Sequence, residues 1–130
     1  GDLPLKRGGV LITVTPCPEG VAQGHPELTE IGYLPFSDVK EMVDRNEIED
    51  LTMAAHIVHV GRIIRDKGRG IMVCPCIDDA TSKKLGFFPA ATPQQALDLA
   101  FSMTDPDATV IVLQNGGDLL PIHEPRRDAR

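Results

Sequence analysis

The stretch that decides the fold is GVLITVTPCPEG, residues 9–20. It begins as a continuous apolar run, which is typical of a strand covered on both faces, and it ends in a loop with two prolines. Prolines lack a backbone N–H and fix φ, so they end the hydrogen-bonding ladder here. Gly20 permits a turn that other residues resist. We therefore expect Cys17 and Glu19 at the carboxyl end of a strand, where ligands bind in open parallel sheets.

Two further apolar runs without alternation predict strands of the same kind. They are GIMVCP, residues 70–75, and ATVIVLQN, residues 108–115. A shorter run, GFFPAA at residues 86–91, predicts a fourth strand, which Pro89 restricts to an edge or irregular position. The expected central strands are residues 10–15, 70–74 and 109–114.

Helical patterns with capping residues separate these strands. In TPQQALDLAFSM, Thr92 is expected to cap the helix, Pro93 to occupy its first position and Gln95 to close a capping box. Asp78 and Gly86 predict the start and end of a shorter helix. Two longer patterns cover residues 37–49, with Ser37 as N-cap, and residues 50–67. This alternation predicts the α/β class: a mostly parallel sheet of three to five strands with helices on both faces, in a three-layer, Rossmann-like arrangement.

The length and composition fit one domain. The chain has 130 residues, of which 42% are hydrophobic. We expect a single domain over residues 1–122 and a charged tail over residues 123–130. The net charge of −6 argues against nucleic acid or an anionic membrane as the main partner, and no run of 18 apolar residues predicts a membrane span. Three cysteines are too few for a disulfide scaffold, which favours a cytoplasmic location.

Three loops are expected to meet at one edge of the sheet: PCPEG, CPCIDD and QNGG. Glycines in such loops let backbone N–H groups approach a ligand, although they can also serve only as turns. Their spacing does not match a dinucleotide or Walker A motif, and no residue can be assigned a catalytic role. Glu19 would suit a general base, or it is a solvated charge. The candidate cleft-lining residues are Cys17, Glu19, Gly20, Gln114, Asn115 and Gly116.

The cysteines allow a metal site as an alternative. Cys17, Cys74 and Cys76 end two strands, and His25 or Asp78 could supply a fourth ligand for zinc or another soft metal. The spacing, however, is C-x-C, and alternate residues of an extended strand point to opposite faces. Free cysteines are also ordinary core residues. We therefore expect no metal site, and this ligand set remains the alternative.

Three motifs in one order resemble a known family. KRGGVLITVTPCPEG resembles the start of the C-terminal domain of the nickel-dependent lactate racemase family, where Lys-x-Gly-Gly precedes a strand that ends in a Cys-x-x-Gly turn. KKLGFFPAATPQQALDLAF is similar to that family's Leu-Gly, short strand and capped Gln-Ala-Leu helix. TVIVLQNGGDLLP is similar to its closing strand, Gly-rich turn and terminal proline. The resemblance covers residues 6–121, and the matching positions include Lys6, Gly8, Gly9, Cys17, Gly20 and Pro121.

The resemblance implies one domain of a two-domain enzyme. In the family, a nickel-pincer nucleotide between the domains takes a hydride from the α-carbon of a 2-hydroxy acid and returns it to either face. The covalent lysine, the nickel-binding histidine and the two catalytic histidines belong to the N-terminal domain, which we expect to be missing from this sequence. The family's cofactor-contacting Gln and Lys lie upstream of the Gly-Gly, before this sequence starts. A tryptophan near the substrate in some members has no counterpart here.

The expected function is therefore that of a lid or half-site domain of a lactate-racemase-like isomerase. Its partners would be the missing N-terminal domain of the same polypeptide and a small 2-hydroxy acid. We expect the nickel-pincer nucleotide in the full-length protein, no cofactor in this chain alone, and no activity from the isolated chain. The rival interpretation is a small metal- or ligand-binding module that uses Cys17, Cys74 and Cys76.

Overall fold

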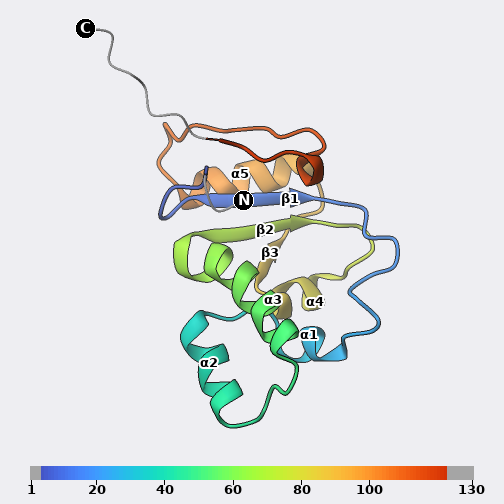
Figure 1. The fold of residues 1–130 in the computed structure, drawn as a ribbon. Helices are drawn as coiled ribbons and strands as arrows, with labels where there is room; N and C mark the ends of the chain where they lie inside the picture. The colour runs from blue at the N-terminus through green and yellow to red at the C-terminus, as the bar shows by residue number, and fades with distance from the viewer. Residues whose placement is uncertain (1–3, 123–130) are drawn as a thin grey trace, which may run out of the picture.

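The apolar run of the opening stretch forms a strand of a small parallel sheet in the computed structural model, which describes residues 4–122 (Figure 1). The expected charged tail, residues 123–130, lies outside the described residues. The strands are β1 (Val10–Val14), β2 (Arg69–Val73) and β3 (Phe87–Pro89). The α-helices are α1 (Pro26–Ile31), α2 (Phe36–Asp44), α3 (Leu51–Gly61), α4 (Asp79–Leu85) and α5 (Pro93–Met103). The π-helix η1 (Arg62–Lys67) continues α3, and η2 (Gly116–Asp118) is a 3₁₀ turn.

The sheet has the order β1-β2-β3, and both pairings are parallel. Val10 pairs with Arg69 and Val14 with Val73, so β1 and β2 end at the same level. The predicted short strand exists as β3, with Pro89 as its last residue on the outer side of β2. A proline is tolerated there because an edge position requires fewer backbone donors. The α/β class with a parallel sheet is confirmed.

Helices cover both faces of the sheet, as predicted. On one face, α5 packs Ala96 and Ala100 against Ile71 and Val73 of β2. On the other face lies the larger core cluster, to which the remaining helices contribute (Figure 1). Its buried members are Leu28, Val39, Ile48, Met53, Ala54, Ile57, Ile63, Ile64, Leu85 and Phe87. The three-layer arrangement follows from strands that are apolar on both faces.

The prediction of a central strand at residues 109–114 is wrong for this structure. Residues 108–113 belong to no strand, and the side chains of residues 110–113 are 43–80% exposed. In Figure 1 this orange segment is drawn on the β1 side of the molecule and runs in the same direction as β1. An apolar run gives a preference for burial, but a strand exists only when a neighbour supplies hydrogen bonds. As a result, β1 is an edge strand, and Phe101 of α5 is 37% exposed.

The predicted helix boundaries hold best where a side chain caps the helix. Asp78 accepts a hydrogen bond from the N–H of Thr81, and Gly86 ends α4 in the left-handed conformation with φ of 103°. Thr92 likewise accepts from the N–H of Gln95. The Gln95 side chain, however, accepts from the N–H of Ala91 at 3.1 Å, rather than closing the expected box on the cap residue.

The expected helix at residues 37–49 differs more. It begins at Phe36 and ends at Asp44, and its N-cap is Pro35 with no side-chain hydrogen bond. The hydroxyl of Ser37, the expected cap, donates instead to the carboxylate of Asp38. The short helix α1 lies in the segment between β1 and α2. It is only six residues long, so its sequence offers too few positions for a periodic pattern.

Candidate functional site

The loop after β1 forms a tight turn at the carboxyl end of the strand. The N–H of Thr15 still donates to the carbonyl of Val73 at 3.1 Å, and the ladder ends there. The N–H of Gly20 then donates to the carbonyl of Cys17 at 2.9 Å, which closes a four-residue turn. Gly20 has φ of 72° and Cys17 has φ of 34°. The turn presents Glu19 as an exposed side chain.

A second turn of the same make-up follows β2. The N–H of Ile77 donates to the carbonyl of Cys74 at 3.3 Å, so this turn also begins with a cysteine. In both turns the second residue is a proline, whose fixed φ suits that position. Because β1 and β2 are parallel and end at the same level, the two Cys-Pro turns lie at the same edge of the sheet. The sequence signal for this pair of turns is the Cys-Pro dipeptide that follows each of two apolar runs.

The two turns bring Cys17 and Cys74 together. The Cys74 thiol lies 3.6 Å from the carbonyl oxygen of Pro16, to which it donates, and the Cys17 thiol lies 3.3 Å from the hydroxyl of Thr15. The Cys74 thiol therefore lies beside the residue that precedes Cys17. Burial raises the pKa of the Cys74 thiol, and Cys17 adds to this rise, whereas the backbone N–H of Cys76 opposes it.

The three thiols differ in their access to solvent. Cys74 is buried, Cys17 is half-buried and Cys76 is exposed. His25, the proposed fourth ligand, pairs instead with the carboxylate of Glu27 at 3.2 Å. Among residues 4–122, no group of three or more His, Cys, Asp or Glu side chains is arranged to hold a metal ion. The structure thus brings two of the four alternative ligands together.

The QNGG loop supplies the other predicted cleft residues. Asn115 adopts a left-handed conformation with φ of 53° and leads into η2. In Figure 1 this short helix is drawn on the side of the molecule toward which the β1 arrow points. Gln114, Asn115 and Gly116 are exposed, and the last strand that was to bring them beside β1 is not formed. Their place in a cleft stays a prediction.

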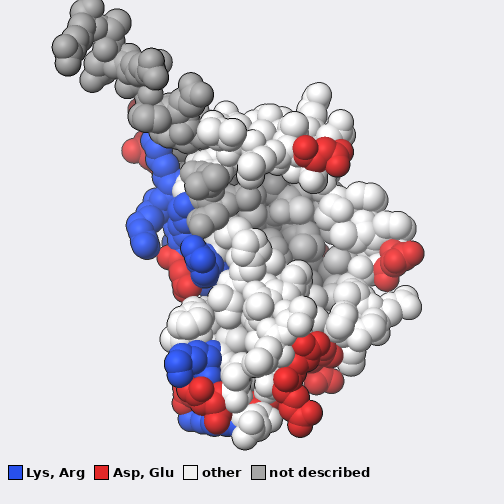
Figure 2. Space-filling model, in the orientation of Figure 1, with Lys and Arg blue, Asp and Glu red and all other residues white. Residues whose placement is uncertain are grey.

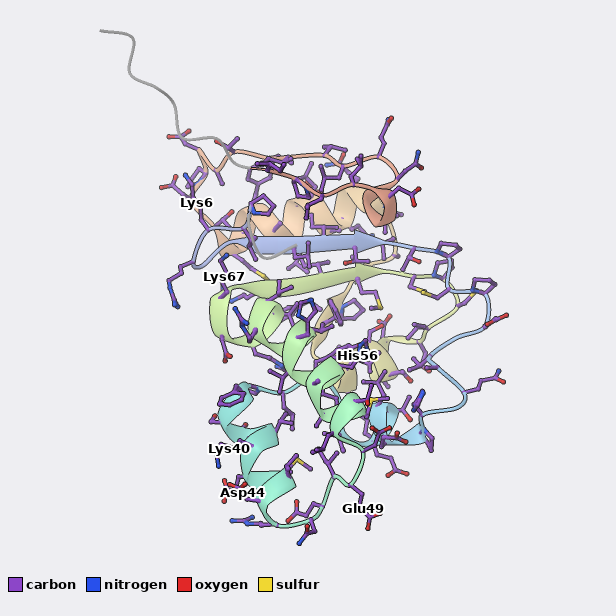
Figure 3. All side chains as sticks on the ribbon, viewed as in Figure 1. Lys6, Lys40, Asp44, Glu49, His56 and Lys67 are labelled. Atoms are coloured by element: carbon purple, nitrogen blue, oxygen red, sulfur yellow. The ribbon has the colours of Figure 1, made fainter. Side chains whose placement is uncertain are left out.

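Lysine and arginine side chains gather at the opposite end of the sheet, where the strands begin (Figure 2). Lys6 and Lys67 lie there, just before β1 and β2 (Figure 3). A surface hollow of about 480 Å³ at this end is lined by Arg7, Phe36, Arg62, Asp66 and Lys67. Positive charge is therefore separated from the Cys-Pro turns by the length of the strands.

The histidines of α3 take no part in either end of the sheet. His56 lies 3.3 Å from the hydroxyl of Tyr33, and the two rings meet edge to face (Figure 3). His59 lines an apolar groove of about 390 Å³ between α2 and α3. Both histidines are exposed at the surface.

The fold and this edge define a class: a small α/β domain with a parallel sheet whose two longer strands end in paired turns at one edge. A comparison with solved structures gives the same fold in a particular protein. The lactate racemase apoprotein from Thermoanaerobacterium thermosaccharolyticum superimposes with a TM-score of 0.62 and 24% sequence identity. The match covers 78% of this chain and 24% of that protein.

That similarity establishes a lactate-racemase-like fold. The matched region spans about a quarter of the length of the racemase. No family model matches the sequence, and no curated protein matches it. No helix within residues 4–122 is long and apolar enough to cross a membrane.

Proposed function

We propose that this chain is the C-terminal, lid or half-site domain of a lactate-racemase-like isomerase. The substrate would be a small 2-hydroxy acid, and a further domain of the same polypeptide would supply the catalytic groups. The observation that carries the proposal is the shared fold, together with the three motifs in their order along residues 6–121. The limited coverage of the racemase also supports a part rather than a whole enzyme. A cytoplasmic location belongs to the same proposal.

The proposed contribution of this chain is the turn that begins at Cys17. Its backbone is fixed by the Cys17–Gly20 hydrogen bond and by Pro18, so the Glu19 carboxylate is held on a preorganised loop. The turn stands at the carboxyl end of β1, which is the usual ligand-binding edge of such sheets. We propose that it forms one wall of the cleft between the domains, with Gln114, Asn115 and Gly116 beside it.

Within residues 4–122, the nickel-pincer nucleotide of the family would find no set of metal ligands. The described residues contain no group of three or more donor side chains placed to bind a metal ion. The two adjacent thiols, Cys17 and Cys74, do not complete such a group. We therefore assign no chemical step to nickel at these residues, and the proposal leaves the cofactor with the other domain.

The test uses the full-length polypeptide that contains this chain, loaded with its cofactor. We expect it to interconvert the two enantiomers of a small 2-hydroxy acid, with lactate as the first substrate to assay. Glu19→Ala should lower turnover by about tenfold, because misplacing a substrate-positioning group costs at least that much. Its urea midpoint should not change, since Glu19 is exposed.

Glu49→Ala is the matched control. Glu49 is also an exposed glutamate, but it lies at the connection between α2 and α3, away from the sheet (Figure 3). Its removal should leave both turnover and stability unchanged. Full turnover in Glu19→Ala, or equal loss in both variants, would contradict the role of the turn. Racemisation by residues 1–130 alone would contradict the assignment of the catalytic groups to another domain.

A further inference from the structure

The carboxyl ends of β1 and β2 carry a pair of thiols that the proposed function does not use. Cys17 and Cys74 come from segments far apart in the sequence, and the parallel register of the two strands brings them to one edge. The Cys74 thiol reaches the carbonyl of Pro16, the residue just before Cys17, at 3.6 Å. Burial raises the pKa of the Cys74 thiol, and Cys17 raises it further, as expected for neighbouring thiols. Two neighbouring thiols held at one edge of the sheet form a dithiol rather than two isolated core cysteines.

We propose that Cys17 and Cys74 are a thiol–disulfide site, which closes to an intrachain disulfide under oxidising conditions and opens again under reducing ones. This site lies on the turn that the proposed function places in the cleft wall, but it does not rest on that function, and its test does not require activity. Oxidation would fasten the turn after β1 to the end of β2. The third cysteine, Cys76, would remain a free thiol.

The backbone at Cys17 supports a site rather than a chance contact. Three described residues other than glycine have a positive φ: Cys17, Asn46 and Asn115. Asparagine adopts this region readily, whereas a cysteine there is uncommon. Strained backbone of this kind is concentrated at functional positions, where the surrounding structure holds it. Here the hydrogen bond from Gly20 to the Cys17 carbonyl holds the turn that carries the thiol.

The same turns explain why Cys76 is not the partner. Cys76 is the third residue of the turn that begins with Cys74, and its side chain is exposed. Its backbone N–H, not its thiol, acts on the Cys74 sulfur. The Cys74 thiol, which donates to the carbonyl of the residue before Cys17, is therefore the partner that the two turns place beside Cys17.

The chemistry requires an oxidant, for which a low-molecular-weight disulfide such as glutathione disulfide is sufficient. The thiolate of half-buried Cys17 attacks one sulfur of glutathione disulfide, and the S–S bond breaks to release one glutathione thiolate. The Cys74 thiol then loses its proton to water, and its sulfur attacks Cys17 Sγ in the mixed disulfide. The second glutathione leaves as its thiolate. Two protein thiols are oxidised, and one glutathione disulfide is reduced to two glutathione molecules.

The experiment equilibrates the reduced chain of 130 residues with defined ratios of reduced and oxidised glutathione, followed by trapping with N-ethylmaleimide. Intact mass spectrometry should show a species that has lost two hydrogens and carries one maleimide, on Cys76. Peptide mapping without reduction should identify the Cys17–Cys74 cross-link. The Cys17–Cys74 cross-link should exceed any cross-link through Cys76 by roughly tenfold, because neighbouring thiols have a high effective concentration.

Matched serine variants locate the site. Cys76→Ser should keep the cross-link, and Cys17→Ser should lose it and retain a glutathione adduct or free thiols. Because Cys74 is buried, Cys74→Ala is made alongside Cys74→Ser, and circular dichroism checks that each variant folds. If neither folds, the map of the native chain and the Cys17→Ser variant decide the result. A dominant cross-link through Cys76, or only glutathione adducts in the native chain, would overturn the proposal.

Discussion

Replacement of Gly61 by alanine sets two physical effects against each other. Gly61 is the last residue of α3 and is buried. Helix propensity alone favours alanine over glycine inside a helix by about 1 kcal/mol. The structure argues the other way, because a Cβ at Gly61 would lie 2.8 Å from the carbonyl carbon of Leu34 and closer still to its oxygen. Ordinary contacts between carbon atoms are about 3.5–4.0 Å.

The size of the stability change in Gly61→Ala depends on which atoms must move to accommodate the added Cβ. The atoms that would clash belong to the backbone of Leu34, in the segment that leads into α2, so a change of side-chain rotamer cannot relieve the contact. Overpacking a core costs about 1–3 kcal/mol, and a backbone clash belongs at the upper end of that range. After the gain in propensity is subtracted, we expect Gly61→Ala to lower the free energy of unfolding by about 2 kcal/mol.

Urea denaturation followed by circular dichroism measures this value. With a slope of about 2 kcal/mol per molar urea, the midpoint should fall by about 1 M. Gly24→Ala is the control, because no atom lies within 4 Å of a Cβ built there. That variant should be unchanged or stabilised by up to about 1 kcal/mol through the unfolded chain. If Gly61→Ala were as stable as the native chain, the close approach of α3 to Leu34 would be refuted.

Three further results follow from the core and the caps. Ile71→Ala, at a fully buried position of β2, should lower the free energy of unfolding by about 2–5 kcal/mol in the same urea assay. Thr92→Ala, which removes the N-cap of α5, should lower it by about 1 kcal/mol, whereas Thr92→Ser should retain most of it. Backbone N–H groups, chiefly that of Thr81, lower the pKa of Asp78 below its ordinary value of 3.8. The contribution of the Asp78 carboxylate to stability is therefore present above pH 3.8 and disappears as the pH falls through the lowered pKa. The difference in urea midpoint between the native chain and Asp78→Ala should accordingly shrink on acidification.

The fold could be predicted from the sequence where a residue's structural role depends mainly on its own type and its neighbours along the chain. The apolar runs that form β1 and β2 are paired in register, and the short run with Pro89 is an edge strand. Asp78 and Thr92 cap their helices because their side chains reach backbone donors nearby in the sequence. Such local interactions can be predicted from the residue order alone.

The prediction failed where the outcome depends on a distant neighbour. Residues 109–114 are as apolar as β1, but strand formation also requires a backbone partner that a sequence pattern cannot show. The close approach at Gly61 is likewise a contact with a residue far along the chain. The N-cap expected at Ser37 is instead Pro35, two residues earlier, where no side chain caps the helix.

The candidate site shows the same division. Its location at the carboxyl end of β1 followed from the strand and its prolines, and the structure places Cys17, Glu19 and Gly20 in a turn there. The pairing of Cys17 with Cys74 depends on the register of β1 and β2, which no single run of sequence specifies. The C-x-C spacing pairs Cys74 with Cys76 along the chain, whereas the structure places Cys74 beside the turn that carries Cys17.

The two outer edges of the sheet differ in length and in hydrogen-bonding capacity. Added strands are therefore expected to pair with one edge rather than the other. On one side, β3 is three residues long and ends in a proline, which withholds a donor from an added strand. On the other side, β1 offers five residues, and within the described chain its only strand partner is β2. Further strands, whether from this polypeptide or from another, are therefore expected to add beyond β1. A tag or fusion partner attached near β3 would leave the β1 edge of the sheet accessible.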